Sequence, residues 1–212
     1  MKLIPKNVVT IKNFNDLNAV IKKLMNGSKI IFFDFDGVIK ESNHIKAEAY
    51  KQLFSEFSED IVKKIIKHHA ENVGKSRYEK IKIYLQYCQL DCNIENLTKY
   101  EIAYSKLVVD KVIDAKFVHG ILDYLKDNFK NQLFSIVSAV PQKEITKITS
   151  RIGISSMFDS INGSPDDKAQ IIIRELTKHS ISPSEALFIG DAWEDWQASL
   201  RVPIKFVYKV SN

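Results

Sequence analysis

The sequence has few of the residues that mark specialised classes of protein. Its 212 residues include only two cysteines, five prolines and seven glycines. Two cysteines cannot build a disulfide framework, so we expect a reducing compartment and a cytoplasmic location. So little proline and glycine excludes a low-complexity chain. No apolar run approaches the roughly 20 residues of a membrane span, and the first residues lack the apolar stretch of a secretory signal. We therefore expect no membrane partner.

Beyond residues 1–33, the numbers of positive and negative side chains are balanced. There are 31 Lys and Arg against 26 Asp and Glu, a formal charge of +5. Residues 1–33 hold six Lys and one Asp, so this segment alone accounts for the surplus. A confined surplus is typical of a solvated surface, whereas nucleic-acid binding needs a basic patch or stripe. We expect no nucleic-acid partner.

Short apolar runs and helical patterns alternate along most of the chain. The apolar runs lie at 30–33, 133–137, 186–189 and 204–208. Runs without polar alternation are typical of strands that are buried on both faces of a parallel sheet. The helical patterns lie at about 15–26, 142–153 and 166–178. This alternation predicts an α/β fold with a Rossmann-like, doubly wound parallel sheet.

Residues 44–118 differ from the rest of the chain. They contain no proline and one glycine, Gly74, and their apolar residues recur at helical spacing. We expect an inserted α-helical cap domain here, with the α/β core formed by 1–43 and 119–212. Within the core, 1–28 is an N-terminal extension that we expect to add a strand and a helix. Gly74 interrupts two helical patterns, so we expect a loop there that hangs over the site.

Polar side chains follow the predicted strands. Asp34 and Asp36 follow the first apolar run, Ser138 the second, and Asp191 comes directly after the run at 186–189 and Gly190. Ligands of open parallel sheets bind outside the carboxyl ends of the strands, so these are the side chains that would meet a ligand. A carboxylate beside a buried strand is costly unless a cation or donor compensates it. Mg²⁺ suits such oxygen ligands, and no His or Cys is present in these motifs for Zn²⁺.

Lys168 and Asp195 extend this group. Residues 164–167 predict a helix start with Ser164 as the N-cap, which places Lys168 in a first turn where the helix dipole disfavours a cation. Either a neighbouring acid such as Asp167 balances Lys168, or Lys168 faces the strand ends and neutralises an anion. Asp195 lies four residues beyond Asp191, on the same face if 192–200 is helical, and the two would repel without a cation between them.

Taken together, these motifs resemble those of the haloacid dehalogenase-like (HAD) superfamily over about residues 29–208. The motifs are DFDGV at 34–38, the serine of IVSAVP, the lysine of GSPDDK, and GDAWED at 190–195. The most similar branch contains the phosphoglycolate phosphatases and β-phosphoglucomutases. Its helical cap is inserted directly after the first motif, as the helical segment is here.

The resemblance implies phosphoryl transfer with Mg²⁺ as the cofactor. Asp34 would attack phosphorus and form an aspartyl-phosphate, and Asp36 would act as the general acid and then the general base. Asp34, the carbonyl of Asp36 and Asp191 would hold the metal. The dehalogenase and phosphonatase branches lack an acid at the position of Asp36, so its presence favours phosphate esters.

The resemblance also implies a phosphate-binding group. Ser138 and Lys168 would bind the transferring phosphoryl oxygens, where charge must be stabilised. Asp195 would support them by orienting either Lys168 or a metal-bound water.

The cap is expected to set specificity. Arg77 and Lys80 would bind the end of the substrate that does not react, or they would instead pair with Glu71 or Glu79 on the helix surface. The histidine pair at 68–69 is expected at the surface or in a helix cap.

Several functions remain open at this stage. The leading one is a Mg²⁺-dependent phosphatase acting on a small phosphorylated metabolite, with a sugar phosphate preferred. A phosphosugar mutase would use the same Asp34, but the mutase branch typically carries His where Lys46 aligns, at a position that would face the cleft. A non-catalytic binding or regulatory protein is a third possibility. We expect a monomer or homodimer.

Overall fold

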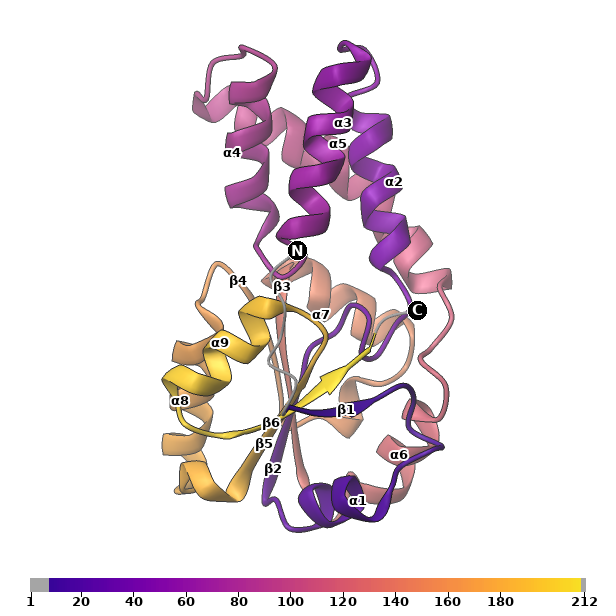
Figure 1. Cartoon of the computed structure of the whole chain (residues 1–212), viewed down its shortest axis with the longest axis vertical. Helices are drawn as coiled ribbons and strands as arrows, with labels where there is room; N and C mark the ends of the chain where they lie inside the picture. The colour runs from indigo at the N-terminus through magenta and orange to yellow at the C-terminus, as the bar shows by residue number, and fades with distance from the viewer. Residues whose placement is uncertain (1–7, 211–212) are drawn as a thin grey trace.

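The computed structural model describes residues 8–210 and contains a six-stranded sheet (Figure 1). The strands are β1 (Val9–Ile11), β2 (Ile30–Phe33), β3 (Leu133–Pro141), β4 (Ser160–Ser164), β5 (Ala186–Gly190) and β6 (Lys205–Lys209). Their order is β1-β6-β5-β2-β3-β4, and every pairing is parallel. The predicted parallel α/β sheet is therefore confirmed.

Helices cover both faces of this sheet. The α-helices of the described residues are α1 (Ala19–Asn26), α2 (Asn43–Leu53), α3 (Glu59–Glu71), α4 (Arg77–Tyr87), α5 (Ile94–Asp114), α6 (Ile121–Asn128), α7 (Gln142–Arg151), α8 (Lys168–His179) and α9 (Trp193–Arg201). Those that cover the sheet are α1, α6 and α7 on one face and α8 and α9 on the other. Alternate residues of β2 point to opposite faces. Ile31 and Phe33 join the core beneath α1, α6 and α7, and Ile30 and Phe32 join the core beneath α8 and α9. The sheet is doubly wound, as predicted.

The strand order reverses beside β2. The chain runs from β2 to β3 and β4 on one side, then crosses to β5 and β6 on the other. Phe33, the last residue of β2, is paired with Ile136 of β3 and Ile189 of β5. A ligand crevice is expected at the carboxyl ends of the strands at such a reversal, and Asp34 is the residue that follows.

Four helices, α2 to α5, stand above the carboxyl ends of the strands (Figure 1). They occupy the chain between β2 and α6, where the helical insert is expected. Their core contains Tyr50, Tyr84 and Tyr104, and the Tyr50 ring centroid lies 5.0 Å from that of Tyr84 and 4.3 Å from that of Tyr104. We refer to α2–α5 as the helical segment; the domain boundaries at 43/44 and 118/119 stay a prediction.

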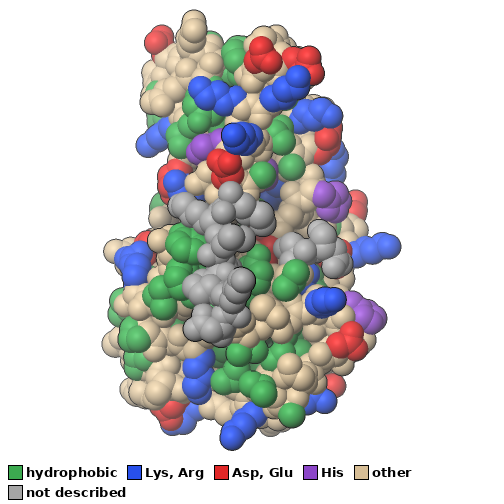
Figure 2. Space-filling view, in the orientation of Figure 1, with side chains coloured by type: hydrophobic (Ala, Val, Ile, Leu, Met, Phe, Trp, Pro, Cys, Tyr) green, Lys and Arg blue, Asp and Glu red, His purple; other side chains and the backbone are tan. Residues whose placement is uncertain are grey.

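One face of the helical segment carries side chains of both charge signs (Figure 2). On the face shown in Figure 2, Lys and Arg side chains alternate with Asp and Glu, and the described side chains form no continuous basic stripe. This distribution agrees with the expected lack of a nucleic-acid partner, which stays a prediction.

The N-terminal extension contributes β1 at the sheet edge and α1 on one face, but α1 begins later than predicted. The Asn18 side chain accepts a hydrogen bond from the Ile21 amide at 3.0 Å and so caps a helix that begins at Ala19. Phe14 precedes both the predicted and the observed helix, and its ring is buried in the core. The periodicity of apolar residues extended the prediction beyond the true cap. Residues 1–7 of the extension lie outside the described residues.

The predicted start of α8 at Ser164 is also wrong. Ser164 ends β4, and α8 begins at Lys168. Asp167 is the N-cap, because its carboxylate accepts from the amides of Ala169 at 3.0 Å and Gln170 at 3.2 Å. Ser164 is therefore left at the carboxyl end of a strand, on the ligand side of the sheet.

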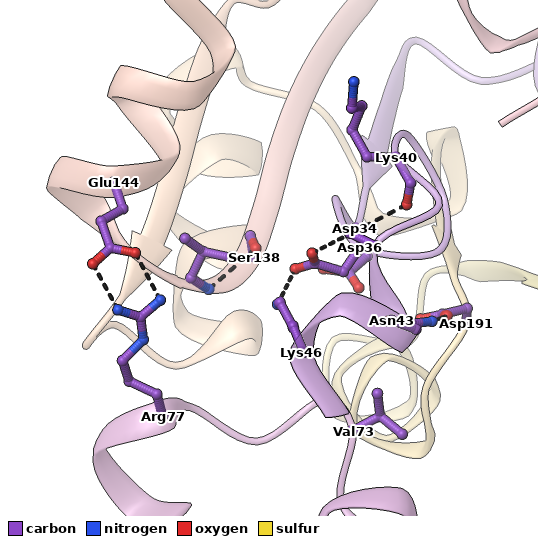
Figure 3. A network of polar contacts seen from close by, with 12 residues as sticks. Asp34, Asp36, Lys40, Asn43, Lys46, Val73, Arg77, Ser138, Glu144 and Asp191 are labelled. Atoms are coloured by element: carbon purple, nitrogen blue, oxygen red, sulfur yellow. Dashed lines mark hydrogen bonds and ion pairs between the residues drawn. The ribbon is translucent and has the colours of Figure 1, made fainter. Parts of the chain in front are cut away.

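An ion pair with little solvent exposure joins α4 of the helical segment to α7 of the α/β base. Arg77 of α4 donates two hydrogen bonds of 2.6 Å to the carboxylate of Glu144 at the start of α7, and a third of 2.6 Å to Ser105 of α5 (Figure 3). The Arg77 side chain is 7% exposed. The predicted alternatives, Glu71 and Glu79, are thus not its partners, because the tertiary fold supplies a bidentate acceptor from another layer.

His69 lies in the last turn of α3, near the expected helix cap, but its side chain is buried in the helical segment and not at the surface. Its ring centroid lies 5.0 Å from that of Tyr50, and Lys80 Nζ lies 3.3 Å from its Nδ1. Burial, together with the charges of Lys80 and Lys46, lowers the pKa of His69 to about 2. The imidazole is therefore neutral in the folded protein.

Removing the acid of the buried pair is predicted to destabilise the fold. Glu144→Gln leaves the Arg77 guanidinium buried without a counter-charge, and the free energy of unfolding should fall by about 3 kcal/mol in urea titrations. Asp110 and Arg151 form a matched, exposed pair between α5 and α7. Asp110→Asn should change stability by less than about 1 kcal/mol. Equal losses in the two variants would contradict the structural role of Arg77.

Acid is predicted to destabilise the protein through His69. In the unfolded chain, His69 binds a proton below its ordinary pKa of 6.5, whereas in the folded chain its pKa is lowered to about 2. Stability therefore falls as the pH drops through 6.5, by about 2 kcal/mol between pH 7 and pH 5. Urea unfolding of the wild type at both pH values should show this loss of stability. The loss should be smaller in His69→Phe. It should equal that of the wild type in His44→Gln, which changes an exposed histidine. An equal loss in wild type and His69→Phe would exclude His69 as its source.

Candidate active site

Three carboxylates meet at the carboxyl ends of β2 and β5. Asp34 follows β2, Asp191 follows β5, and Asp195 lies in the first turn of α9 (Figure 3 labels the first two). One oxygen from each lies within 4.8 Å of the other two. The helix begins at Trp193, so Asp191 does not share a helical face with Asp195 as predicted. The adjacent strands bring the carboxylates together instead.

Lys168 is the cation of this group. Its Nζ donates to Asp34 Oδ1 at 3.0 Å and to Asp195 Oδ1 at 2.5 Å, and all three side chains are buried. Burial lowers the pKa of Lys168, but Asp195 and Asp34 outweigh it and raise the pKa above its ordinary value. The ammonium is therefore charged. Of the two predicted possibilities, Lys168 faces the strand ends.

Burial and the surrounding charges together raise the pKa of the Asp34 carboxyl. Burial raises its pKa, Lys168 opposes this rise, and the nearby charges of Asp195, Asp191 and Asp36 add to it. A second cation among these carboxylates would stabilise the ionised form of Asp34. The oxygen-only donor set and its spacing are consistent with a metal ion, and suit Mg²⁺ better than Zn²⁺.

Asp36 points away from the carboxylate group and towards α2. Its Oδ1 accepts a hydrogen bond from Ser42 Oγ at 2.6 Å, and its Oδ2 forms an ion pair with Lys46 Nζ (Figure 3). Asp36 and Lys46 line the same cavity as Asp34 and Lys168. Lys46 thus faces the cleft, as predicted, and holds the carboxyl of Asp36 in place.

Two neighbouring residues were missed by the sequence reasoning. Asn43 Nδ2 donates to Asp191 Oδ2 at 2.7 Å and so orients this carboxylate (Figure 3). Gly37 has φ = +78°, and a Cβ at this position would collide with Asp191 Oδ2. The glycine of the DFDGV motif was a usable signal for a close approach. Asn43 carried none, because its partner is distant in sequence.

Two serine hydroxyls line the large cavity beside Lys168. Ser138 lies within β3, and its Oγ accepts from the Val140 amide at 3.2 Å. Ser164 Oγ is buried and finds no hydrogen-bond partner among residues 8–210. Ser138, Ser164 and Lys168 line one cavity, so three donors converge there. Ser164 was assigned only a capping role from the sequence.

The loop between α3 and α4 closes over these side chains. Gly74 approaches α9 so closely that a Cβ there would lie 2.7 Å from Glu194 Oε2 and 2.9 Å from the Cβ of Ala192. Val73 and Gly74 line the cavity that contains Asp34. The loop predicted at Gly74 therefore hangs over the site.

Lys80 enters the site from α4 and is nearly inaccessible. Its side chain is buried, and its Nζ donates to the Val73 carbonyl at 3.0 Å. A small cavity lined by Lys46, Arg77 and Lys80 adjoins the one containing Asp34. The structure thus brings Lys46 to the cavity at Asp34 and places Arg77 and Lys80 in the adjoining one, where Arg77 is paired with Glu144.

Known proteins with related sequences and structures cover most of the chain. A phosphorylated carbohydrates phosphatase of Thermotoga maritima is 20% identical over 188 residues, which cover 85% of this chain and 84% of that protein. A β-phosphoglucomutase from Clostridium difficile superimposes with a TM-score of 0.70 at 20% identity, covering 85% of this chain and 84% of that one. CbbY from Rhodobacter sphaeroides, in complex with xylulose 1,5-bisphosphate, gives 0.70 at 13% identity, with 87% of each chain covered.

None of the helices in residues 8–210 is long and apolar enough to span a membrane.

The family follows from the extent of the match. The family model for haloacid dehalogenase-like hydrolases matches residues 31–209, which include the four motifs and the helices between them. With carboxylates at the carboxyl ends of two strands, Lys168 in contact with Asp34, and Ser138 of β3 lining the same cavity as Lys168, the chain belongs to the haloacid dehalogenase-like hydrolase family.

Proposed function

We propose that this protein is a Mg²⁺-dependent phosphatase that hydrolyses a small phosphorylated metabolite through an aspartyl-phosphate. The observation that carries the proposal is the position of Asp34, a buried carboxylate 3.0 Å from the Lys168 ammonium at the end of the central strand. A nucleophile and a cation at this distance suit attack on a phosphoryl group. The similarity to the phosphorylated carbohydrates phosphatase of T. maritima supports a sugar phosphate as the substrate of this protein.

The metal would be held by oxygen atoms of three residues. We assign the carboxylates of Asp34 and Asp191 and the main-chain carbonyl of Asp36 to this role. Asp195 lies in the same group, but its two oxygens already accept from Lys168 and from the Ala192 amide. When bound, Mg²⁺ would neutralise the repulsion between Asp34 and a phosphate dianion.

The reaction requires two proton transfers at Asp36. As an Asp34 oxygen bonds to phosphorus, the bond from phosphorus to the ester oxygen breaks, and Asp36 protonates that leaving oxygen. Water then attacks the aspartyl-phosphate, Asp36 takes its proton, and inorganic phosphate leaves with Asp34 restored. Ser42 and Lys46 hold the Asp36 carboxyl in position for both steps.

The phosphoryl oxygens would be bound by Lys168 and Ser138. Lys168 already lies against Asp34, so an oxygen on the attacked phosphorus would be within reach of its ammonium. Asp195 holds Lys168 in this position through the 2.5 Å contact and leaves its ammonium charged. Asp195 is therefore a positioning residue in the proposed mechanism.

Loss of the nucleophile is predicted to abolish turnover. Asp34→Asn keeps the size of the side chain but removes its charge, so hydrolysis of p-nitrophenyl phosphate with Mg²⁺ should fall at least about a thousandfold. Asp123→Asn, an exposed carboxylate on α6, is the matched control and should keep wild-type rates. EDTA should abolish wild-type turnover, and added Mg²⁺ should restore it. Undiminished turnover in Asp34→Asn would refute the assignment.

A phosphosugar mutase is the second candidate, because β-phosphoglucomutase superimposes with a TM-score of 0.70. The lysine at position 46 departs from the histidine typical of that branch. We predict that β-glucose 1-phosphate releases inorganic phosphate and yields no glucose 6-phosphate, with or without a sugar bisphosphate activator. Product analysis by ³¹P NMR distinguishes the two, and bisphosphate-dependent isomer formation would establish the mutase instead.

A further inference from the structure

Lys80 is a buried cation with no acidic partner in contact. Its relative exposure is 3%, and none of the ion pairs within 4.0 Å among residues 8–210 includes it. Its Nζ reaches only neutral acceptors, the Val73 carbonyl at 3.0 Å and His69 Nδ1 at 3.3 Å. A buried ammonium is costly unless an anion compensates it, so this position lacks a counter-charge.

Of the other cations that line these two cavities, Lys168 and Arg77 are buried and Lys46 and Lys75 are half-buried, and all but Lys75 have such a partner. The pairs are Lys168 with Asp34 and Asp195, Lys46 with Asp36, and Arg77 with Glu144. Lys80 is the fully buried cation of this group that has none. Lys40 and Lys209 are also buried and form no ion pair within 4.0 Å among residues 8–210, but neither lines the cavities at Asp34 and Lys80. Lys80 is therefore the buried, unpaired cation at the site.

The position of Lys80 relative to the reaction centre is suited to a substrate. The small cavity at Lys80 and the cavity at Asp34 share three lining residues, Lys46, Val73 and Ala139. A molecule whose phosphoryl group lies against Asp34 would thus extend past this shared wall towards Lys80. Tyr50 and Tyr104 line the far side of the small cavity and provide no negative charge, since burial raises the pKa of both phenols.

We propose that Lys80 binds a second anionic group, a carboxylate or a second phosphate, on the end of the substrate that does not react. This inference rests on the proposed phosphatase function and specifies its substrate class. It separates the roles of two residues of α4: Lys80 recognises the ligand, and Arg77 holds α4 against α7 through Glu144.

The ionisation of Lys80 agrees with this role. Burial, together with the charge of Lys46, lowers its pKa to about 7, and the more distant carboxylates of Glu194, Asp36 and Glu79 oppose the change. His69 adds no charge, because it is neutral in the folded protein. An anion bound at Nζ would raise the pKa of Lys80 and favour its charged form.

Pairs of esters that differ only at the second group test the inference. One pair is 2-phosphoglycolate and 2-hydroxyethyl phosphate, which compares a carboxylate with a hydroxyl. The other is propane-1,3-diol bisphosphate and its monophosphate. In phosphate-release assays, at least one anionic ester should exceed its neutral partner in kcat/KM by about tenfold or more. The pair that shows the effect identifies the anion.

Variants assign the preference to the residue. Lys80→Met should reduce the ratio to about one, chiefly by raising KM for the anionic ester, and Lys80→Arg should retain part of it. Lys82→Met, at an exposed lysine on the same helix, should keep the wild-type ratio. Lys80→Gln replaces Lys80→Met if the latter does not fold.

The outcomes separate this inference from the phosphatase proposal. A wild-type ratio near one for both pairs, or a ratio that survives in Lys80→Met, overturns the role of Lys80. Hydrolysis of p-nitrophenyl phosphate that depends on Asp34 would leave the phosphatase proposal standing in that case. Absence of turnover with every ester overturns both.

Discussion

The site depends on one buried ammonium held between two buried carboxylates. Lys168 contacts Asp34 and Asp195, and each of the three comes from a different element: α8, the end of β2, and α9. Without this cation, the acidic group at the strand ends would be strongly repulsive. The same contacts hold Asp34, the proposed nucleophile, in place and connect the central strand to both helices on one face of the sheet.

A second set of interactions holds the helical segment against this centre. Gly74 allows the α3–α4 loop to approach α9, and Arg77 joins α4 to α7 through Glu144. The two contacts involve opposite sides of the cleft, one at α9 and one at α7. Together they enclose the reaction centre and bring Lys80 beside it, so the residues that would select a substrate are positioned by packing between layers.

Features encoded locally were predictable from the sequence, and features that depend on distant partners were not. Strands β2, β3, β5 and β6 and the position of Asp34 were found because buried strands produce continuous apolar runs that end at polar residues. Strand β4 was not among them, because its sequence SINGS contains no apolar run. The start of α8 was misplaced because Ser164 and Pro165 imitate a cap that Asp167 provides. Neither the pairing of Arg77 with Glu144 nor the burial of His69 leaves a local pattern, since both depend on how the layers meet.

Asp195 contributes both to the charge of the site and to the start of α9. One of its oxygens accepts a hydrogen bond from the Lys168 ammonium, and the other accepts one from the Ala192 amide at the start of α9. Gly190 leaves room for this side chain, since a Cβ there would collide with it. A substitution of Asp195 therefore disturbs a helix terminus as well as the charge of the site. A redesign of the charge at this position would therefore also have to supply another acceptor for the Ala192 amide, at the start of α9.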